Sequence, residues 1–212
     1  MLRYLYAEDL KTTPLLRDTM FRDRADQFKT RLGWDVTVNA QGEERDEYDD
    51  LNPLYVIWQR PDGTHGGSMR FLPTTGRCMV NDHFLDLTGG VRIQSPLIWE
   101  CTRFCLTRGA EATVAAALML GGGEILERFG LRHFAGVFDA RMVRIYRRIG
   151  SSPTVLGTSG SGRDAISVGL WEFSPEAKAR VARQAGLSEA LSDAWFKQAF
   201  KPGSQPPFAL TG

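Results

Sequence analysis

The chain has 212 residues, of which 42% are hydrophobic and 24% are charged, as in a folded globular protein. Its 26 basic and 25 acidic residues leave a net charge of +1, which excludes a global electrostatic attraction to nucleic acid or membrane. Three cysteines are too few for a disulfide framework, and no metal-ligand spacing surrounds them. The first ten residues make a poor signal peptide, and no apolar run approaches the roughly 18 residues that span a bilayer. We therefore expect a cytoplasmic protein that binds no metal.

The first half of the chain predicts a strand, a long helix, an acidic loop and a hairpin. Thr13 can cap the helix, Pro14 is tolerated in its first turn, and Gly33 can end it. Two apolar runs of strand length flank a turn made of Pro, Asp, Gly and Thr, a pattern typical of a β-hairpin. The expected elements are a strand over 2–6, a helix over 13–32, a loop over 39–52, and hairpin strands over 54–58 and 67–72.

The second half alternates strands and helices. The expected elements are a strand over 98–106, a helix over 112–129, a strand over 131–138, a helix over 142–149, strands over 155–157 and 165–173, and one or two helices over 175–200. This order predicts an α/β fold, a three-layer α/β/α sandwich on a mixed sheet with some parallel pairing. We expect a single domain over 1–200 and a disordered tail over 201–212, because no internal repeat or linker interrupts the pattern.

Two opposite charges, Glu100 and Arg103, stand in the otherwise apolar strand predicted over 98–106. An ionised side chain in a buried strand is costly unless it is paired or used. Residues three apart on a regular strand face opposite ways, so a shared pocket requires an irregularity such as a β-bulge near Thr102. Such a bulge would also free backbone N–H groups. A salt-bridged core is the alternative interpretation of the two charges.

A second set of charged and aromatic residues precedes this strand. Arg24 and Phe28 share one stripe of the predicted helix because they are four residues apart. With Trp34, two aspartates of the acidic loop and Arg70, they suggest a cleft for a zwitterionic, partly aromatic ligand. The alternatives are a solvated ion-pair face for Arg24, core packing for Phe28 and Trp34, surface solvation for Asp46 and Asp49, and a buried Asp–Arg pair for Arg70.

Taken in order, these residues resemble a known family signature. The series is Arg24-x-x-x-Phe28-x-x-x-x-x-Trp34, Asp46-x-x-Asp49, Arg70-Phe71 and Glu100-x-x-Arg103-Phe104. It resembles the signature of the acyl-homoserine-lactone synthases, bacterial enzymes that make quorum-sensing autoinducers, over roughly residues 1–173. The resemblance implies a fold similar to the GNAT-type N-acetyltransferases. It also implies transfer of an acyl chain from acyl carrier protein, or from acyl-CoA, to S-adenosylmethionine, followed by lactonisation and release of methylthioadenosine. S-adenosylmethionine would be a substrate, and we expect no cofactor.

The residues suit this chemistry. We expect Glu100 to act as the base that neutralises the substrate amine, because apolar surroundings raise the pKa of a carboxyl group. A guanidinium can bind the ligand carboxylate, and aromatic faces and carboxylates suit the positively charged sulfonium. The expected catalytic residues are Glu100, Arg103 and Arg70. The expected substrate-binding residues are Arg24, Phe28, Trp34, Asp46, Asp49 and Phe104.

The resemblance also predicts features of the acyl donor. Gly136 and Met142 are expected to line the acyl-chain pocket. In this family a Thr at the position of Gly136 tends to accompany 3-oxo chains, so Gly136 predicts an unsubstituted or 3-hydroxy chain. Four arginines over 141–148 suit an acidic carrier protein, although a helix also favours arginine near its C-terminus. The alternative functions are an acyl-CoA-dependent N-acyltransferase that acts on another amine and a sandwich that only binds.

Overall fold

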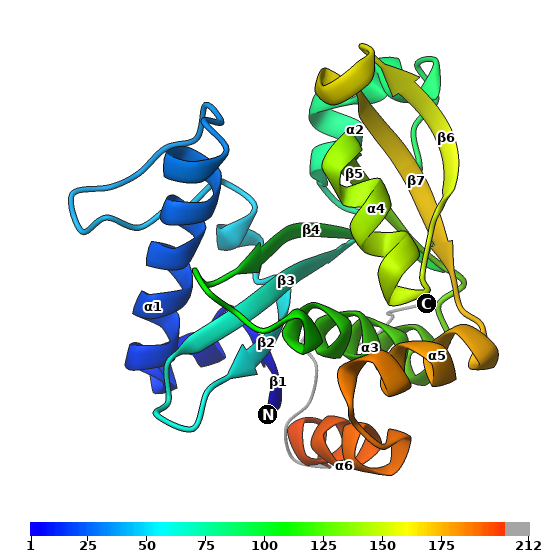
Figure 1. Cartoon of the computed structure of the whole chain (residues 1–212). Coiled ribbons are helices and arrows are strands. Elements are labelled where there is room, and N and C mark those ends of the chain that lie inside the picture. Colours follow the sequence, from blue (N-terminus) through cyan, green and yellow to red (C-terminus); the bar gives the residue numbers. More distant parts are fainter. Residues whose placement is uncertain (202–212) are drawn as a thin grey trace.

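A seven-stranded sheet runs through the structure, a computed structural model that describes residues 1–201 (Figure 1). The strands are β1 (Leu2–Tyr6), β2 (Leu54–Gln59), β3 (His65–Pro73), β4 (Ile98–Leu106), β5 (His133–Asp139), β6 (Thr154–Ser159) and β7 (Ile166–Glu172). They lie in the order β1-β2-β3-β4-β5-β7-β6, and β4–β5 is the one parallel pair among the described strands. The predicted mixed sheet is confirmed, and each predicted strand end lies within two residues of the observed one.

Helices cover both faces of the sheet, and the strand β2 is therefore buried on both sides. Leu54 and Val56 pack in the cluster that includes Leu118 of α3 (Ala112–Arg128), whereas Tyr55 and Ile57 pack against α1 (Pro14–Ala25). The helices α5 (Pro175–Ala185) and α6 (Glu189–Ala199) contact α3 and complete its layer (Figure 1). The predicted three-layer α/β/α sandwich is therefore confirmed.

The helix predicted over 13–32 is wrong in its last turns. After α1 the chain continues as a π-helical segment, Asp26–Arg31, in which the N–H of Leu32 donates to the carbonyl of Gln27 at 3.1 Å. The N–H of Trp34 then donates to the carbonyl of Phe28 at 2.9 Å, and the two rings stack with centroids 5.1 Å apart. Wide turns of this kind are frequent at functional sites. The hydrophobic pattern could not reveal the turn because it predicts the inward stripe and not the hydrogen-bond register.

Two short or displaced helices also differ from the prediction. The helix α2 (Met79–His83) was not predicted, because five residues are too few for a periodic pattern. The helix α4 (Ala140–Ile149) begins two residues early, since the carboxylate of Asp139 accepts the N–H groups of Arg141 and Met142. The C-terminal helical stretch is two helices, separated at Gly186 with its φ of 66°. Of the predicted tail, only Lys201 belongs to the described residues.

The strands β4 and β5 separate soon after they pair. Only Ile98–Glu100 of β4 pair with His133–Ala135 of β5, and β5, β7 and β6 then rise away from β4 (Figure 1). On the other side of β4, Arg70 pairs with Thr102 but Ser68 pairs with Cys105, so β4 carries one extra residue. The extra residue coincides with Arg103, whose φ of 53° is left-handed. The predicted β-bulge is confirmed, one residue beyond Thr102.

Within residues 1–201, no helix is both long enough and apolar enough to cross a bilayer.

Candidate active site

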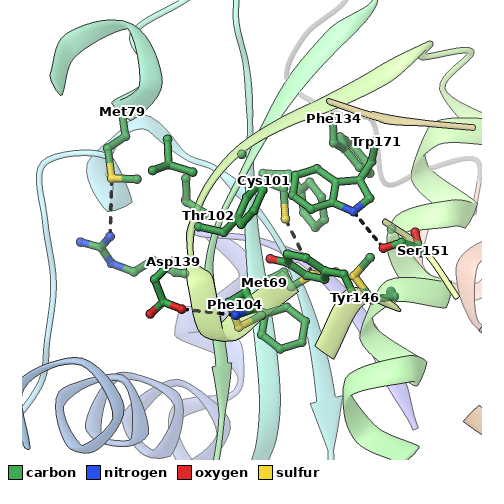
Figure 2. A pocket seen from close by; sticks show the side chains of 18 of the residues that line it. Met69, Met79, Cys101, Thr102, Phe104, Phe134, Asp139, Tyr146, Ser151 and Trp171 are labelled. Carbon is green, nitrogen blue, oxygen red and sulfur yellow. Dashed lines mark hydrogen bonds between the residues drawn. The ribbon is translucent and has the colours of Figure 1, made fainter. Parts of the chain in front are cut away.

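A cavity of about 720 Å³ occupies the space where β4 and β5 diverge, a size typical of ligand-binding pockets. One end is lined by Phe28, Trp34 and Arg103. The remainder is mostly apolar and extends between the sheet and the helices α3 and α5. Its walls include Met69, Phe71, Cys101, Phe134, Tyr146 and Trp171, most of which are labelled in Figure 2. The cavity thus joins an aromatic, cationic end to a long apolar one.

Three arginines and three carboxylates form a closed ion-pair network beside the cationic end. Its members are Arg24, Arg70, Arg103, Glu44, Asp46 and Asp49. Arg24 donates to Glu44 at 2.6 Å and through both terminal nitrogens to Asp49 at 2.9 Å. The network carries equal numbers of positive and negative charges, as burial requires.

The other two arginines close the network. Arg70 donates to Asp46 at 2.5 Å and to Asp49 at 2.8 Å, and its Nε donates to the hydroxyl of Thr102 at 3.1 Å. Arg103 contacts Asp46 at 2.6 Å, and it also donates to Glu44 at 3.0 Å. Four elements therefore hold one another in place through these contacts: α1, the acidic loop, β3 and β4.

The electrostatic balance fixes the charge state of the carboxylates. Burial alone would raise the pKa of Asp49, but the charges of Arg24 and Arg70 hold it well below its usual range. At Asp46, burial also favours a higher pKa, but the hydrogen bond from Arg70 and the positive charge of Arg70 lower the pKa overall. The pKa of the Arg24 guanidinium is raised because the charges of Asp49 and Glu44 outweigh its burial. These groups stay ionised across the physiological pH range.

The structure decides among the alternatives for these residues. Arg24 has 0% of its surface exposed and Asp49 has 3%, so a solvated ion-pair face and surface solvation are both wrong for them. The buried Asp–Arg pair proposed for Arg70 is confirmed. Glu44 was missed as a member of the network. A charge count indicates that three arginines beside two aspartates need one more carboxylate, but it does not select Glu44 from the acidic loop.

Of the three arginines in the network, Arg103 lines the cavity, whereas Arg24 and Arg70 do not. Its guanidinium lies over the ring of Phe28, 5.5 Å from the ring centroid, and Trp34 stacks on Phe28. Among residues 1–201, its Nη1 makes one hydrogen bond, to the sulfur of Met79 at 3.7 Å, which is a weak acceptor (Figure 2). Arg103 can therefore present an N–H group to a ligand without giving up a carboxylate partner.

Glu100 has a different environment. It is 1% exposed, and its two carboxylate oxygens accept the N–H groups of Met79 at 3.0 Å and Val80 at 2.5 Å. Burial raises its pKa, and the two backbone hydrogen bonds oppose that shift only in part. The carboxylate thus fixes the start of α2, whose residues Met79 and His83 line the cavity.

The predicted site residues fall into two groups. Those that line the cavity are Phe28, Trp34, Arg103, Phe104, Gly136 and Met142. Those that lie behind its wall are Arg24, Asp46, Asp49, Arg70 and Glu100.

The ion-pair network predicts sensitivity to acid. The folded-state pKa of Asp49 lies below the unfolded value of about 3.9, so its stabilisation is complete above about pH 5 and is lost as the pH falls through these two values. We expect the free energy of unfolding, measured by urea denaturation, to fall with increasing slope as the pH drops below about 4. Asp49→Asn should have a shallower slope, and an unchanged slope would contradict the assignment.

Known proteins resemble this chain in sequence and in fold. Residues 8–181 match the family described as autoinducer synthase. An acyl-homoserine-lactone synthase of Rhizobium etli is 41% identical over 203 residues, which cover 92% of this chain and 93% of the relative. The solved structure of a CoA-dependent acyl-homoserine lactone synthase, MesI, superposes with a TM-score of 0.77 at 26% identity and covers 89% of this chain and 96% of that one. An acyl-CoA N-acyltransferase from Pseudomonas aeruginosa, 15% identical, shares the fold alone, with a TM-score of 0.53 over 81% of this chain and 99% of that one.

Proposed function

This chain belongs to the autoinducer synthase family and is an acyltransferase of the acyl-homoserine-lactone synthase type, and we propose that its acyl donor is acyl carrier protein and its acceptor S-adenosylmethionine. The methionine amine would attack the thioester, so that an amide forms, the acyl–sulfur bond breaks and the carrier leaves as a free thiol. The carboxylate would then displace methylthioadenosine from the γ-carbon and close the lactone. The observation that carries this proposal is the cavity itself, which joins Arg103 and two stacked aromatic rings to a long apolar end.

Arg103 would bind the carboxylate of S-adenosylmethionine. Its guanidinium is already oriented by Glu44 and Asp46, and its Nη1 donates to the thioether of Met79, a weak acceptor that a ligand carboxylate can replace. Trp34 is 41% exposed and offers a ring face to the sulfonium or to the adenine base. We propose that Arg24, Arg70, Asp46 and Asp49 act through the network, by holding Arg103 in place.

Amide formation requires polarisation of the thioester carbonyl. The bulge leaves Arg103 and Phe104 without ladder partners on β3, and β5 pairs with β4 only up to Glu100. Backbone N–H groups at the bulge could therefore stabilise the oxyanion that develops on the thioester. Lactonisation would then need the carboxylate held in line with the departing methylthioadenosine, a matter of positioning. Glu100, which the sequence predicts as the base, lies outside the cavity lining and is 1% exposed, a position that does not favour this role.

The product should carry no 3-oxo group. A Cβ added at Gly136 would lie 3.0 Å from the Trp171 ring and 3.1 Å from the carbonyl of Cys101, so the site offers little room for a hydroxyl-bearing side chain. We expect unsubstituted or 3-hydroxy chains in the lipid extract of expressing cells, analysed by mass spectrometry. Dominant 3-oxo products would contradict this prediction.

Two glycines of α3 are expected to set the chain length. Gly122 and Gly123 line the apolar end, and a Cβ there would make ordinary contacts, 3.4 Å to Phe134 and 3.6 Å to Lys178. Gly122→Val should therefore fill cavity space and shift the product distribution, measured by mass spectrometry, towards shorter chains. Gly121→Ala is the matched control, because its Cβ would lie 2.7 Å from Val56 and should lower stability instead. An unchanged distribution for Gly122→Val would contradict the prediction.

The surface of α4 supports a carrier protein as donor. Its exposed side chains include Arg141, Arg144, Arg147 and Arg148, with the apolar Val143 and Ile145 among them. A basic surface of this kind complements an acidic partner and accelerates encounter. Initial rates with matched acyl-carrier-protein and acyl-CoA donors would test this choice. A strong preference for acyl-CoA that Arg144→Glu does not change would refute acyl carrier protein as the donor. The assignment as a synthase would still hold.

Mass spectrometry of organic extracts from an expressing host tests the function as a whole. A homoserine-lactone fragment ion absent from the vector control is the expected result. Soluble protein without that ion, in a host with a wide acyl pool, would favour the transfer of an acyl chain to another amine.

A further inference from the structure

We propose that Glu100 serves the reaction as a positioning residue that holds the cavity-lining segment 79–84 against Arg103, and that it does not accept the amine proton. This inference rests on the proposed function, since it concerns the binding of S-adenosylmethionine. It assigns a role to a buried carboxylate that lies behind the cavity wall.

Both carboxylate oxygens of Glu100 are already occupied by the backbone at the start of α2. Each of its oxygens accepts one backbone N–H group, from Met79 at 3.0 Å and from Val80 at 2.5 Å. The side chain is 1% exposed and does not line the cavity. A general base must come within hydrogen-bond reach of the proton that it accepts, directly or through one water. Glu100 would have to release the start of α2 to do so.

The segment that Glu100 holds forms part of the substrate end. Met79, His83 and Phe84 line the cavity there. The sulfur of Met79 lies 3.7 Å from Nη1 of Arg103, the nitrogen that we assign to the ligand carboxylate. Displacement of Met79 would therefore change the surroundings of that nitrogen directly.

A second buried side chain holds the same segment from its other side. The amide of Asn81, which is 2% exposed, donates to the carbonyl of Ile93 at 2.8 Å and accepts the N–H group of Ile93 at 2.9 Å. Glu100 and Asn81 thus make the same kind of attachment, two hydrogen bonds between one buried side chain and the backbone. Only Glu100 can titrate, which makes Asn81 a matched control.

The chemistry does not demand a strong base. An α-amino group has a pKa of about 7.7–8.0, so about a quarter or more of it is already neutral at pH 7.5. A carboxylate that only removed this proton from the bound substrate would gain a few-fold in rate at that pH. Its contribution would vanish at about pH 9, where the amine is neutral without help.

This difference defines the experiment. Product formation by wild-type protein, Glu100→Gln and Asn81→Ala is measured by mass spectrometry at pH 7 and pH 9, with KM for S-adenosylmethionine and kcat determined separately. Thermal unfolding at both pH values checks that each variant is folded. Gln keeps one carbonyl acceptor for the start of α2 but cannot act as a base.

A positioning role predicts that both variants raise KM for S-adenosylmethionine by about tenfold or more, with the same relative loss at both pH values. Glu100→Gln loses one charge-assisted hydrogen bond, and Asn81→Ala loses two neutral ones. If kcat of Glu100→Gln instead recovers towards the wild-type value at pH 9 while KM is unchanged, the inference is overturned and Glu100 is the base. The profile of Glu100→Gln decides alone if Asn81→Ala does not fold. Absence of product from the wild-type protein would instead refute the proposed function.

Discussion

Replacing Arg103 by alanine is expected to lower kcat/KM for S-adenosylmethionine by about 10²- to 10³-fold. The guanidinium is the charged group that we assign to the substrate carboxylate, and loss of one partner of a desolvated charge pair costs about 2–5 kcal/mol. Because Arg103 lines the cavity and its Nη1 has only the weak acceptor Met79 among residues 1–201, we expect the effect to fall on substrate binding. Steady-state kinetics with S-adenosylmethionine as the varied substrate measure it.

A conservative variant separates charge from geometry. Arg103→Lys keeps the positive charge beside Glu44 and Asp46 but cannot reproduce the planar fork that contacts both. We expect it to recover stability more fully than activity. Activity of Arg103→Ala within a few-fold of wild type would contradict the assignment.

Replacing Arg24 by methionine is expected to destabilise the fold by about 3–5 kcal/mol, because each of two buried carboxylates, Glu44 and Asp49, loses one of its two arginine partners and the network is left with an excess negative charge. Arg24 has 0% of its surface exposed and donates to both Glu44 and Asp49. Urea denaturation with linear extrapolation measures the loss.

Arg108 provides the control for that change. It also pairs with a carboxylate, Asp26 at 2.8 Å, but its side chain is 71% exposed. Arg108→Met should shift the urea midpoint very little, because exposed ion pairs contribute little to stability. Equal midpoints for Arg24→Met and the wild-type protein would show that the network does not stabilise the fold.

The amount of fold that the sequence predicts depends on the length and periodicity of each element. The strand Ile98–Leu106 was predicted to the residue, because its apolar run has the length of a strand. The π-helical turn at Asp26–Arg31 was not, since one apolar stripe fits both kinds of turn. The helix Met79–His83 is too short to show a period, and it begins where a distant carboxylate, that of Glu100, accepts its N–H groups.

The sequence indicates which residues gather at the site, but not which of them pair with one another. The bulge at Arg103 follows from a geometric argument, that two charges three residues apart cannot share a pocket on a regular strand. The pairing of Arg24 with Glu44 could not be inferred in this way, because an acidic loop offers several carboxylates and only the folded chain selects among them. The attachment of Glu100 to Met79 depends equally on tertiary structure.

Purified protein provides the most direct test that this cavity converts S-adenosylmethionine and an acyl thioester into a lactone. The measurement is mass spectrometry of the products formed from S-adenosylmethionine labelled in the methionine carbons, with acyl carrier protein as the acyl donor. We expect an N-acyl-homoserine lactone that carries the label, formed in equal amount with methylthioadenosine. An acylated product without the label, or release of methylthioadenosine without an acylated lactone, would contradict it.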